Sequence, residues 1–222
     1  NIVDPWDHFN REGADATRWY MVTAGAPWNP LKFDSNGVRE TYAKMFLTLW
    51  NVYRFHADYA ALDAFDPASS TSSYESRSRL DRWILSKLHT MAKAYHDGFT
   101  NWNYHKACRE LEDFIVNDLS NWYVRRSRRR LWDEAESGDK LACQHTLHEI
   151  LVTLCRLIAP VSPFMVDTIH RNLTGETVHT AAWPLGTPGS TEGATADAWK
   201  EDLVSATQQL PPHDAELEHE MT

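Results

Sequence analysis

The sequence lacks the features that mark membrane-spanning, secreted and disulfide-bonded proteins. It has no run of about 18 apolar residues, the length that a transmembrane helix needs, and no basic-then-apolar leader at its first residues. Its 222 residues include three cysteines, Cys108, Cys143 and Cys155, and no Cys-x-x-Cys pair. We therefore expect buried, reduced thiols in a cytoplasmic protein that has no membrane partner.

Familiar catalytic and metal-binding motifs are also missing. No Gly-rich phosphate loop, G-x-S-x-G sequence or zinc knuckle occurs. His145 and His148 stand three residues apart beside Glu149, whereas the metalloprotease pattern places its histidines four apart, so we expect no metal site. Carboxylate pairs such as Glu112 and Asp113 are explained by pairing with Lys and Arg on helix surfaces. Taken alone, the chain has the character of a binding module rather than an enzyme.

Positive charge is scarce overall but is concentrated in one segment. The formal net charge is −9. Residues 1–76 hold 6 cations and 10 anions, residues 77–132 hold 12 and 6, and residues 133–222 hold 4 and 15. This asymmetry is typical of a local basic patch within an acidic surface, and it favours a polyanion as the partner of the middle segment.

The middle segment contains a predicted long helix over residues 101–132 that changes character near its end. Its helical period gives an apolar face of Ala107, Leu111, Phe114, Ile115, Leu119 and Trp122. The arginines that follow, Arg125, Arg126, Arg128, Arg129 and Arg130, fan over roughly 200° of the helix circumference. Two interpretations stay open: a solvated basic helix end favoured by the helix dipole, or a phosphate-binding surface, because a guanidinium matches phosphate better than an ammonium does. Trp122, Tyr123 and Trp132 flank the run and could stack on bases.

The remaining periodicity predicts an all-α fold of about five main helices preceded by a small helical segment. Besides the long helix, we expect main helices over residues 35–62, 78–97, 140–158 and 163–173, with Gly98 ending the second of these. Two short helices are expected before them, one that starts at Asp4 and ends at Gly13 and one over residues 14–22. Residues 178–184 are a candidate short strand, and residues 185–222 have the composition of a linker or tail.

Several stretches resemble class I aminoacyl-tRNA synthetases in the region after their KMSKS signature. N-I-V-D-P-W at residues 1–6 and G-A-D-A-T-R-W-Y at 13–20 carry this resemblance. Particular similarity to the isoleucine enzymes lies in L-T-L-W-N-V-Y at 47–53, L-D-R-W-I-L-S at 80–86 and N-D-L-S-N-W-Y-V-R-R-S-R-R-R-L-W at 117–132, with I-A-P-V-S-P-F at 158–164 and the stretch 178–184 also similar. Two small departures are Leu131, where Phe is common, and Ala182, where Asp is common.

The resemblance implies a C-terminal fragment that contains the anticodon-binding domain of an isoleucyl-tRNA synthetase. Residues 1–34 would be the end of the catalytic core, which contacts the tRNA stem, residues 35–184 the helical anticodon-binding domain, and residues 185–222 an acidic linker. The family's HIGH and KMSKS motifs would lie upstream, so we expect the fragment alone to be catalytically inactive and to hold no cofactor. The full-length parent would use ATP and Mg²⁺ to join isoleucine to its tRNA, and zinc is a candidate in the missing parts.

The implied partner is isoleucine tRNA, with no role for DNA. We assign phosphate and ribose contacts to Arg125, Arg126, Arg128, Arg129 and Arg130. Trp132 is a stacking candidate or a core residue, and Lys87 on the facing helix either extends the patch or lies along its own apolar stripe. Asn1 would adjoin the KMSKS loop of the parent. Two alternatives remain: a valyl-tRNA synthetase fragment, or a helical interaction scaffold whose arginines pair with acidic neighbours.

Overall fold

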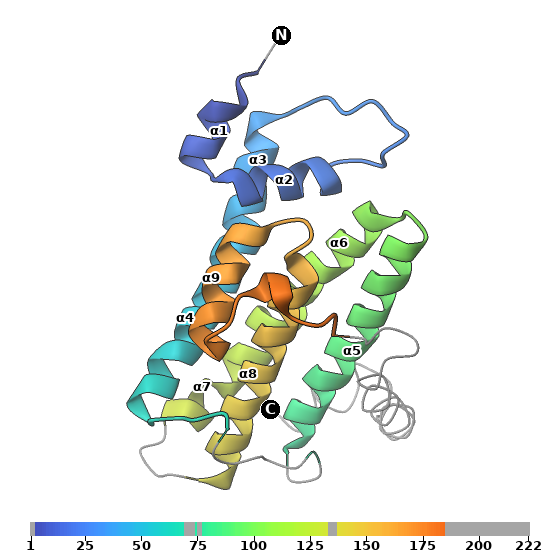
Figure 1. The fold of residues 1–222 in the computed structure, drawn as a ribbon. Coiled ribbons are helices and arrows are strands. Elements are labelled where there is room, and N and C mark those ends of the chain that lie inside the picture. Colours follow the sequence, from blue (N-terminus) through green and yellow to red (C-terminus); the bar gives the residue numbers. More distant parts are fainter. Residues whose placement is uncertain (1–2, 69–73, 75–76, 133–136, 185–222) are drawn as a thin grey trace. The chain divides into compact units, whose positions relative to one another are not determined.

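The computed structural model describes residues 3–68, 74, 77–132 and 137–184 of the chain. All regular secondary structure in these residues is helical (Figure 1). The α-helices are α1 (Pro5–Arg11), α2 (Ala14–Thr23), α3 (Ser35–Thr41), α4 (Leu47–Leu62), α5 (Arg79–Thr100), α6 (Tyr104–Asp113), α7 (Arg125–Trp132), α8 (Gly138–Ile158) and α9 (Pro163–Thr174). The π-helical segments η1 (Tyr42–Phe46) and η3 (Phe114–Val124) join α3 to α4 and α6 to α7, and η4 (Val178–Thr180) is a 3₁₀ turn. No strand occurs in these residues, so the predicted all-α fold is confirmed.

Helix α8 forms the centre of the bundle. It contacts α4, α5, α7 and α9, and Figure 1 shows it among these helices. Its apolar residues include Leu147, Ile150, Leu151, Leu154, Leu157 and Ile158, all of which are fully buried. Each such side chain contributes about 1.5–3 kcal/mol when it leaves water, so α8 provides much of the support on which the outer helices rest.

Local capping residues place most helix ends where the sequence predicts them. The Asp4 carboxylate accepts a 3.0 Å hydrogen bond from the Trp6 amide at the start of α1. The hydroxyl of Ser137 accepts from the Lys140 amide at 3.1 Å, so α8 begins slightly earlier than expected. Gly175 ends α9 with a φ of 80°, a conformation that glycine adopts without strain.

Gly98 does not end a helix, and here the prediction is wrong. Helix α5 continues to Thr100, and α6 starts at Tyr104 after a turn in which Trp102 has a φ of 59°. A Cβ atom on Gly98 would lie 2.6 Å from the Cβ of Ala107. Gly98 is therefore required for the close approach of α5 to α6, which form a helical hairpin (Figure 1).

The segment α6–η3–α7 keeps one face buried through a strict four-residue spacing. The residues of this series are Ala107, Leu111, Ile115, Leu119, Tyr123, Ser127 and Leu131, and each is at most 2% exposed. In a straight α-helix, residues four apart drift by about 40° per step, so the series would wind about 240° around the helix. The i→i+5 hydrogen bonding of η3 places more residues in each turn and compensates for this drift.

The same π-helical winding corrects two predictions about aromatic residues. Trp122, expected on the apolar face, is only half-buried. Tyr123 takes the core position and is fully buried, so it is not available to stack on a base. An α-helical period applied through residues 114–124 assigns these two neighbours to the wrong sides.

Residues 178–184 form no strand, contrary to expectation. The carboxylate of Asp167 in α9 accepts hydrogen bonds from the Thr177 hydroxyl at 2.6 Å and the Val178 amide at 2.9 Å. These bonds fold the segment into η4 against α9. Side-chain bonds to one helix, rather than pairing with another extended segment, determine its conformation.

Contacts between α2 and the start of α9 join residues 3–34 to the bundle. The Asp15 carboxylate accepts from the amides of Phe164 at 3.2 Å and Met165 at 2.7 Å. Arg18 donates through Nε to the Val161 carbonyl at 2.6 Å, so it supports this joint. All described residues belong to a unit that ends at Pro184, and a domain boundary at residue 34 stays a prediction.

Candidate nucleic-acid interface

Helix α7 carries four exposed arginines, Arg125, Arg126, Arg128 and Arg129, which we call the arginine surface. Ser127 and Leu131 fix its orientation because both are buried. On an α-helix, Arg125, Arg128 and Arg129 then fall within about 100° of one another on the side away from the core. In Figure 1, α7 lies at the end of the bundle away from α1 and α2.

Three guanidinium groups of the arginine surface lack a carboxylate partner within the described residues. The ion pairs found there include none to Arg125, Arg128 or Arg129. Like charges three or four residues apart on a helix each cost about 0.2–0.5 kcal/mol. The surface is therefore a concentrated positive charge that a polyanion would relieve.

Arg126 belongs to a column of neighbouring side chains, contributed by α7, η3 and α5, in which the Trp122 and Trp83 rings are tilted by 53°. Its guanidinium carbon lies 3.7 Å from the centroid of the Trp122 ring, and that ring is 6.4 Å from Trp83. Lys87 Nζ lies 5.8 Å from the Trp83 centroid and 3.7 Å from an Asp118 carboxylate oxygen. A cation–π contact of this kind contributes about 0.5–1 kcal/mol at a partly exposed site. The column orients Arg126 and has Lys87 at its other end.

Arg130, the last arginine of the run, has a different environment. It donates through Nη1 and Nη2 to the two carboxylate oxygens of Asp81 at 2.8 and 2.7 Å. Nε and Nη2 also reach the Asp139 carboxylate, at 2.7 and 2.8 Å. Its predicted RNA contact stays a prediction, but the donors that would reach a phosphate already have protein partners.

Asp81 is fully buried, and its partners decide its charge. Burial by itself raises the pKa of a carboxyl, but the hydrogen bonds and charge of Arg130, with hydrogen bonds from Tyr123 and Ser78, outweigh it and leave the Asp81 pKa below its usual value. For Arg130, burial acts to lower the pKa, and the bonds to Asp81 and Asp139 raise it above its usual value. Both groups are therefore charged at neutral pH.

The structure describes the environment of Trp132 but not that of Asn1, the two remaining residues with a predicted role. Trp132 is 57% exposed at the end of α7, so it is not a core residue and its ring is accessible. Asn1 lies outside the described residues. Nothing in the structure tests the RNA contacts assigned to the arginines, to Lys87 or to Trp132, and these stay predictions.

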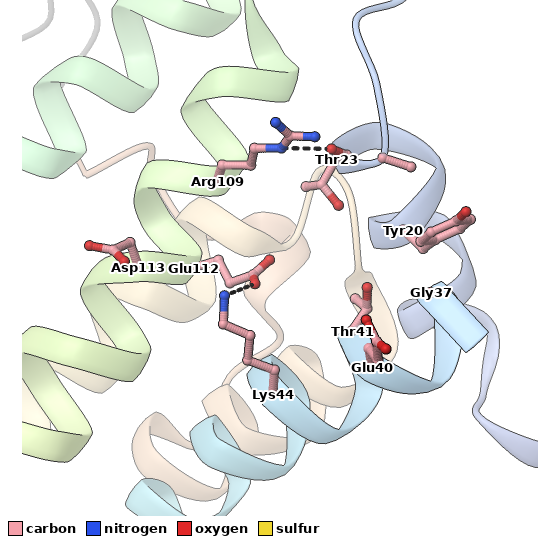
Figure 2. Close-up of a pocket in the computed structure, with 10 residues that line it drawn as sticks. Tyr20, Thr23, Gly37, Glu40, Thr41, Lys44, Arg109, Glu112 and Asp113 are labelled. Carbon is pink, nitrogen blue, oxygen red and sulfur yellow. Dashed lines mark hydrogen bonds and ion pairs between the residues drawn. The ribbon is translucent and has the colours of Figure 1, made fainter. Parts of the chain in front are cut away.

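The structure has a pocket of about 440 Å³ between α2, α3, η1 and α6 that the sequence does not predict (Figure 2). Lys44 Nζ lies 2.9 Å from Glu112, and Arg109 Nε donates to the Thr23 carbonyl at 2.7 Å. Glu40 and Asp113 add further negative charge to the lining. No sequence motif signals the pocket, because its residues come from separate elements. Its cations are bound to the chain's own oxygens, so the lining does not form a phosphate site.

The cysteines take no part in chemistry at the surface. Cys108, Cys143 and Cys155 are all buried and unpaired. Burial raises the pKa of Cys108 to about 12, of Cys143 to about 11 and of Cys155 to about 12. The thiols are consequently protonated at neutral pH, which makes them poor nucleophiles.

The described residues also contain no group of His, Cys, Asp and Glu side chains arranged to hold a metal ion. Within residues 3–184, leaving out the gaps given above, no helix has both the length and the apolar composition needed to cross a bilayer.

The structure of the bundle is similar to that of a known tRNA-bound enzyme. The LeuRS of Agrobacterium radiobacter, solved as a ternary complex with tRNA and LeuAMS, superposes with a TM-score of 0.60 at 18% sequence identity. The similarity covers 83% of this chain and 21% of that one. At this level of identity it supports the fold alone.

Closer sequence relatives are curated as isoleucine–tRNA ligases. The Clostridium novyi and Porphyromonas gingivalis enzymes are each 44% identical over 83% of this chain, covering 18% and 16% of their own lengths. The Cytophaga hutchinsonii enzyme is 39% identical over 95% of this chain and 19% of its own. The chain thus spans about a fifth of the length of these relatives. The model of the anticodon-binding domain of tRNA ligases matches residues 81–210, more than half of the sequence. The chain therefore belongs to the family of anticodon-binding domains of tRNA ligases.

Proposed function

We propose that the chain is the tRNA-binding part of an isoleucine–tRNA ligase and that α7 carries its main RNA contact. The observation that supports this most is the arginine surface, in which Arg125, Arg128 and Arg129 are exposed without a carboxylate partner among the described residues. Contacts to phosphate fix register and orientation, whereas unstacked loop bases supply sequence information. The arginines would provide the first, and the accessible ring of Trp132 would provide stacking for the second.

The scaffold alternative, in which arginines pair with acidic neighbours, describes Arg130, whereas Arg125, Arg128 and Arg129 have no such neighbour among the residues that the structure describes. The names of the relatives favour an isoleucine enzyme over a valine enzyme. We further propose that the protein is cytoplasmic and that the full-length parent enzyme requires ATP and Mg²⁺.

The proposed contact is tested by the salt dependence of binding to the anticodon stem–loop of isoleucine tRNA. Each phosphate contact contributes about 0.7–0.9 to the slope of log affinity against log salt. Arg128→Gln should lower that slope by about one contact's share. Arg11→Gln makes the same change at an exposed arginine of α1 and should leave the slope unchanged. Equal effects of the two substitutions would show that α7 is not the contact.

A second expectation concerns catalysis. The chain contains neither a HIGH nor a KMSKS sequence, the motifs on which adenylate formation depends in the family it resembles. We expect no isoleucine-dependent ATP–pyrophosphate exchange from the purified chain. Exchange above background, retained through further purification, would contradict the assignment of the chain to a binding role.

A further inference from the structure

We propose that Asp81 and Arg130 are positioning residues for RNA binding. Their buried ion pair keeps α7 folded in the free protein, so that the arginine surface is already ordered when RNA binds. This inference rests on the proposed function. It assigns the final arginine of the run to the protein's interior rather than to the RNA.

The geometry of Arg130 carries the first step. Its guanidinium meets Asp81 through two parallel hydrogen bonds of 2.8 and 2.7 Å. The Asp139 carboxylate accepts hydrogen bonds from Arg130 Nε at 2.7 Å and Nη2 at 2.8 Å, and the Asp139 backbone carbonyl accepts one from Nη2 at 3.0 Å. A guanidinium that is hydrogen-bonded to carboxylates on two sides has a fixed orientation. The Arg130 side chain is also only 16% exposed.

Asp81 connects the other elements around α7. It is the N3 residue of a capping box at the start of α5, where its carboxylate accepts from the Ser78 amide and hydroxyl at 3.2 and 2.8 Å. The Tyr123 hydroxyl donates to it from η3 at 2.5 Å. One carboxylate thus joins the start of α5, the end of η3 and, through Arg130, both α7 and the first turn of α8.

The charge on α7 explains why such an anchor is needed. Arg125 repels Arg128 and Arg129 at three- and four-residue spacing, which destabilises α7, the last two turns of the continuous segment α6–η3–α7. A helix end that unfolded in the free protein would have to be ordered during binding, at a cost in affinity. The Asp81–Arg130 pair holds the last turn of α7 before RNA arrives.

The proposal predicts a change in affinity without a change in the number of phosphates contacted. In the full chain, with the anticodon stem–loop of isoleucine tRNA as probe, Asp81→Asn and Arg130→Gln should each weaken binding by on the order of tenfold. Both should keep the wild-type salt slope, because the arginine surface still reaches the same phosphates in the complex. The double variant should be no weaker than either single one, since the two residues act as a pair.

Asp63→Asn is the matched control. Asp63 is a carboxylate with two side-chain partners, Lys140 Nζ at 2.7 Å and Gln144 Nε2 at 2.6 Å. Its side chain is 22% exposed, whereas Asp81 is fully buried, and both of its partners lie on α8 and neither on α7. Hydrogen exchange should show loss of protection at the α7 amides in Asp81→Asn and not in Asp63→Asn. Should Asp81→Asn fail to fold, Asp139→Asn removes the charge of the outer partner, which is 54% exposed, and should give a smaller change of the same kind.

Three outcomes would overturn the inference. If Arg130→Gln lowers the salt slope as Arg128→Gln does, Arg130 touches RNA directly. If Asp63→Asn weakens binding as much as Asp81→Asn, the effect is general destabilisation. If the α7 amides exchange equally in both Asp variants, the pair does not order α7. Absence of RNA binding by the wild-type chain would instead contradict the proposed function, and the exchange measurement would still test the anchor.

Discussion

Neighbouring arginines of one run have different environments, because the partners of Arg130 include a residue from a distant part of the sequence. Asp81 lies 49 residues before Arg130, and no local pattern connects the two. The exposure of Arg125 and Arg129 could be predicted, because charged residues rarely lie in a core without a partner. The burial of Arg130 could not be predicted, since it depends on where the start of α5 places Asp81.

His56 shows how burial sets the pH dependence of stability. It is 2% exposed, and burial together with the charge of His148 lowers its pKa to about 3. Between about pH 6.5 and 3 the unfolded chain therefore binds a proton that the folded chain does not, and the free energy of unfolding falls as the pH falls through this range. One such group would cost about 2 kcal/mol at pH 5 relative to pH 7.5.

Urea unfolding at the two pH values measures this loss. His56→Phe removes the titrating group and should reduce the difference in unfolding free energy between them. The residual dependence would come from His148 and His89, whose pKa values burial also lowers. An unchanged pH dependence in the variant would show that His56 is protonated in the folded chain.

At the scale of elements, local signals placed helix ends well and helix phase poorly. Asp4 and Gly175 act through their own backbone neighbours, so the sequence is sufficient to place them. The four-residue series from Ala107 to Leu131 was a visible signal of altered winding, because it fits a straight α-helix poorly. An α-helical period placed Trp122 in the core where the structure has Tyr123.

Gly98 gives a test of packing between two elements. Gly98→Ala would place a methyl group 2.6 Å from the Ala107 Cβ, so α5 and α6 would have to move apart. We expect a loss of about 1–3 kcal/mol in the free energy of unfolding, the usual cost of overpacking. Urea denaturation measures it.

Gly138→Ala is the control for this prediction, because an added Cβ there meets nothing within 4 Å. In α8 it should be neutral or stabilise by up to about 1 kcal/mol, through the higher helix propensity of alanine. If Gly98→Ala were equally neutral, the interface between α5 and α6 would be loose enough to accept a methyl group.

At the scale of the whole molecule, a chain with a negative net charge carries a local basic surface, the arginine surface of α7. The net charge of −9 conceals an excess of cations in residues 77–132, and the structure gathers four of them as exposed arginines on α7. Composition by segment was enough to predict that cations would be concentrated in this part of the chain. The pocket between α2 and α6 was beyond such reasoning, because its lining comes from elements that are separate in sequence.

The measurement that tests the central claim most directly is a titration of the full chain with isoleucine tRNA and valine tRNA at two salt concentrations. We predict salt-sensitive binding that favours isoleucine tRNA and falls when Arg125 and Arg129 are both replaced by alanine. Salt-sensitive binding that persists undiminished in the double variant would contradict the claim that α7 holds the RNA. Equal affinity for both tRNAs would contradict the assignment to isoleucine.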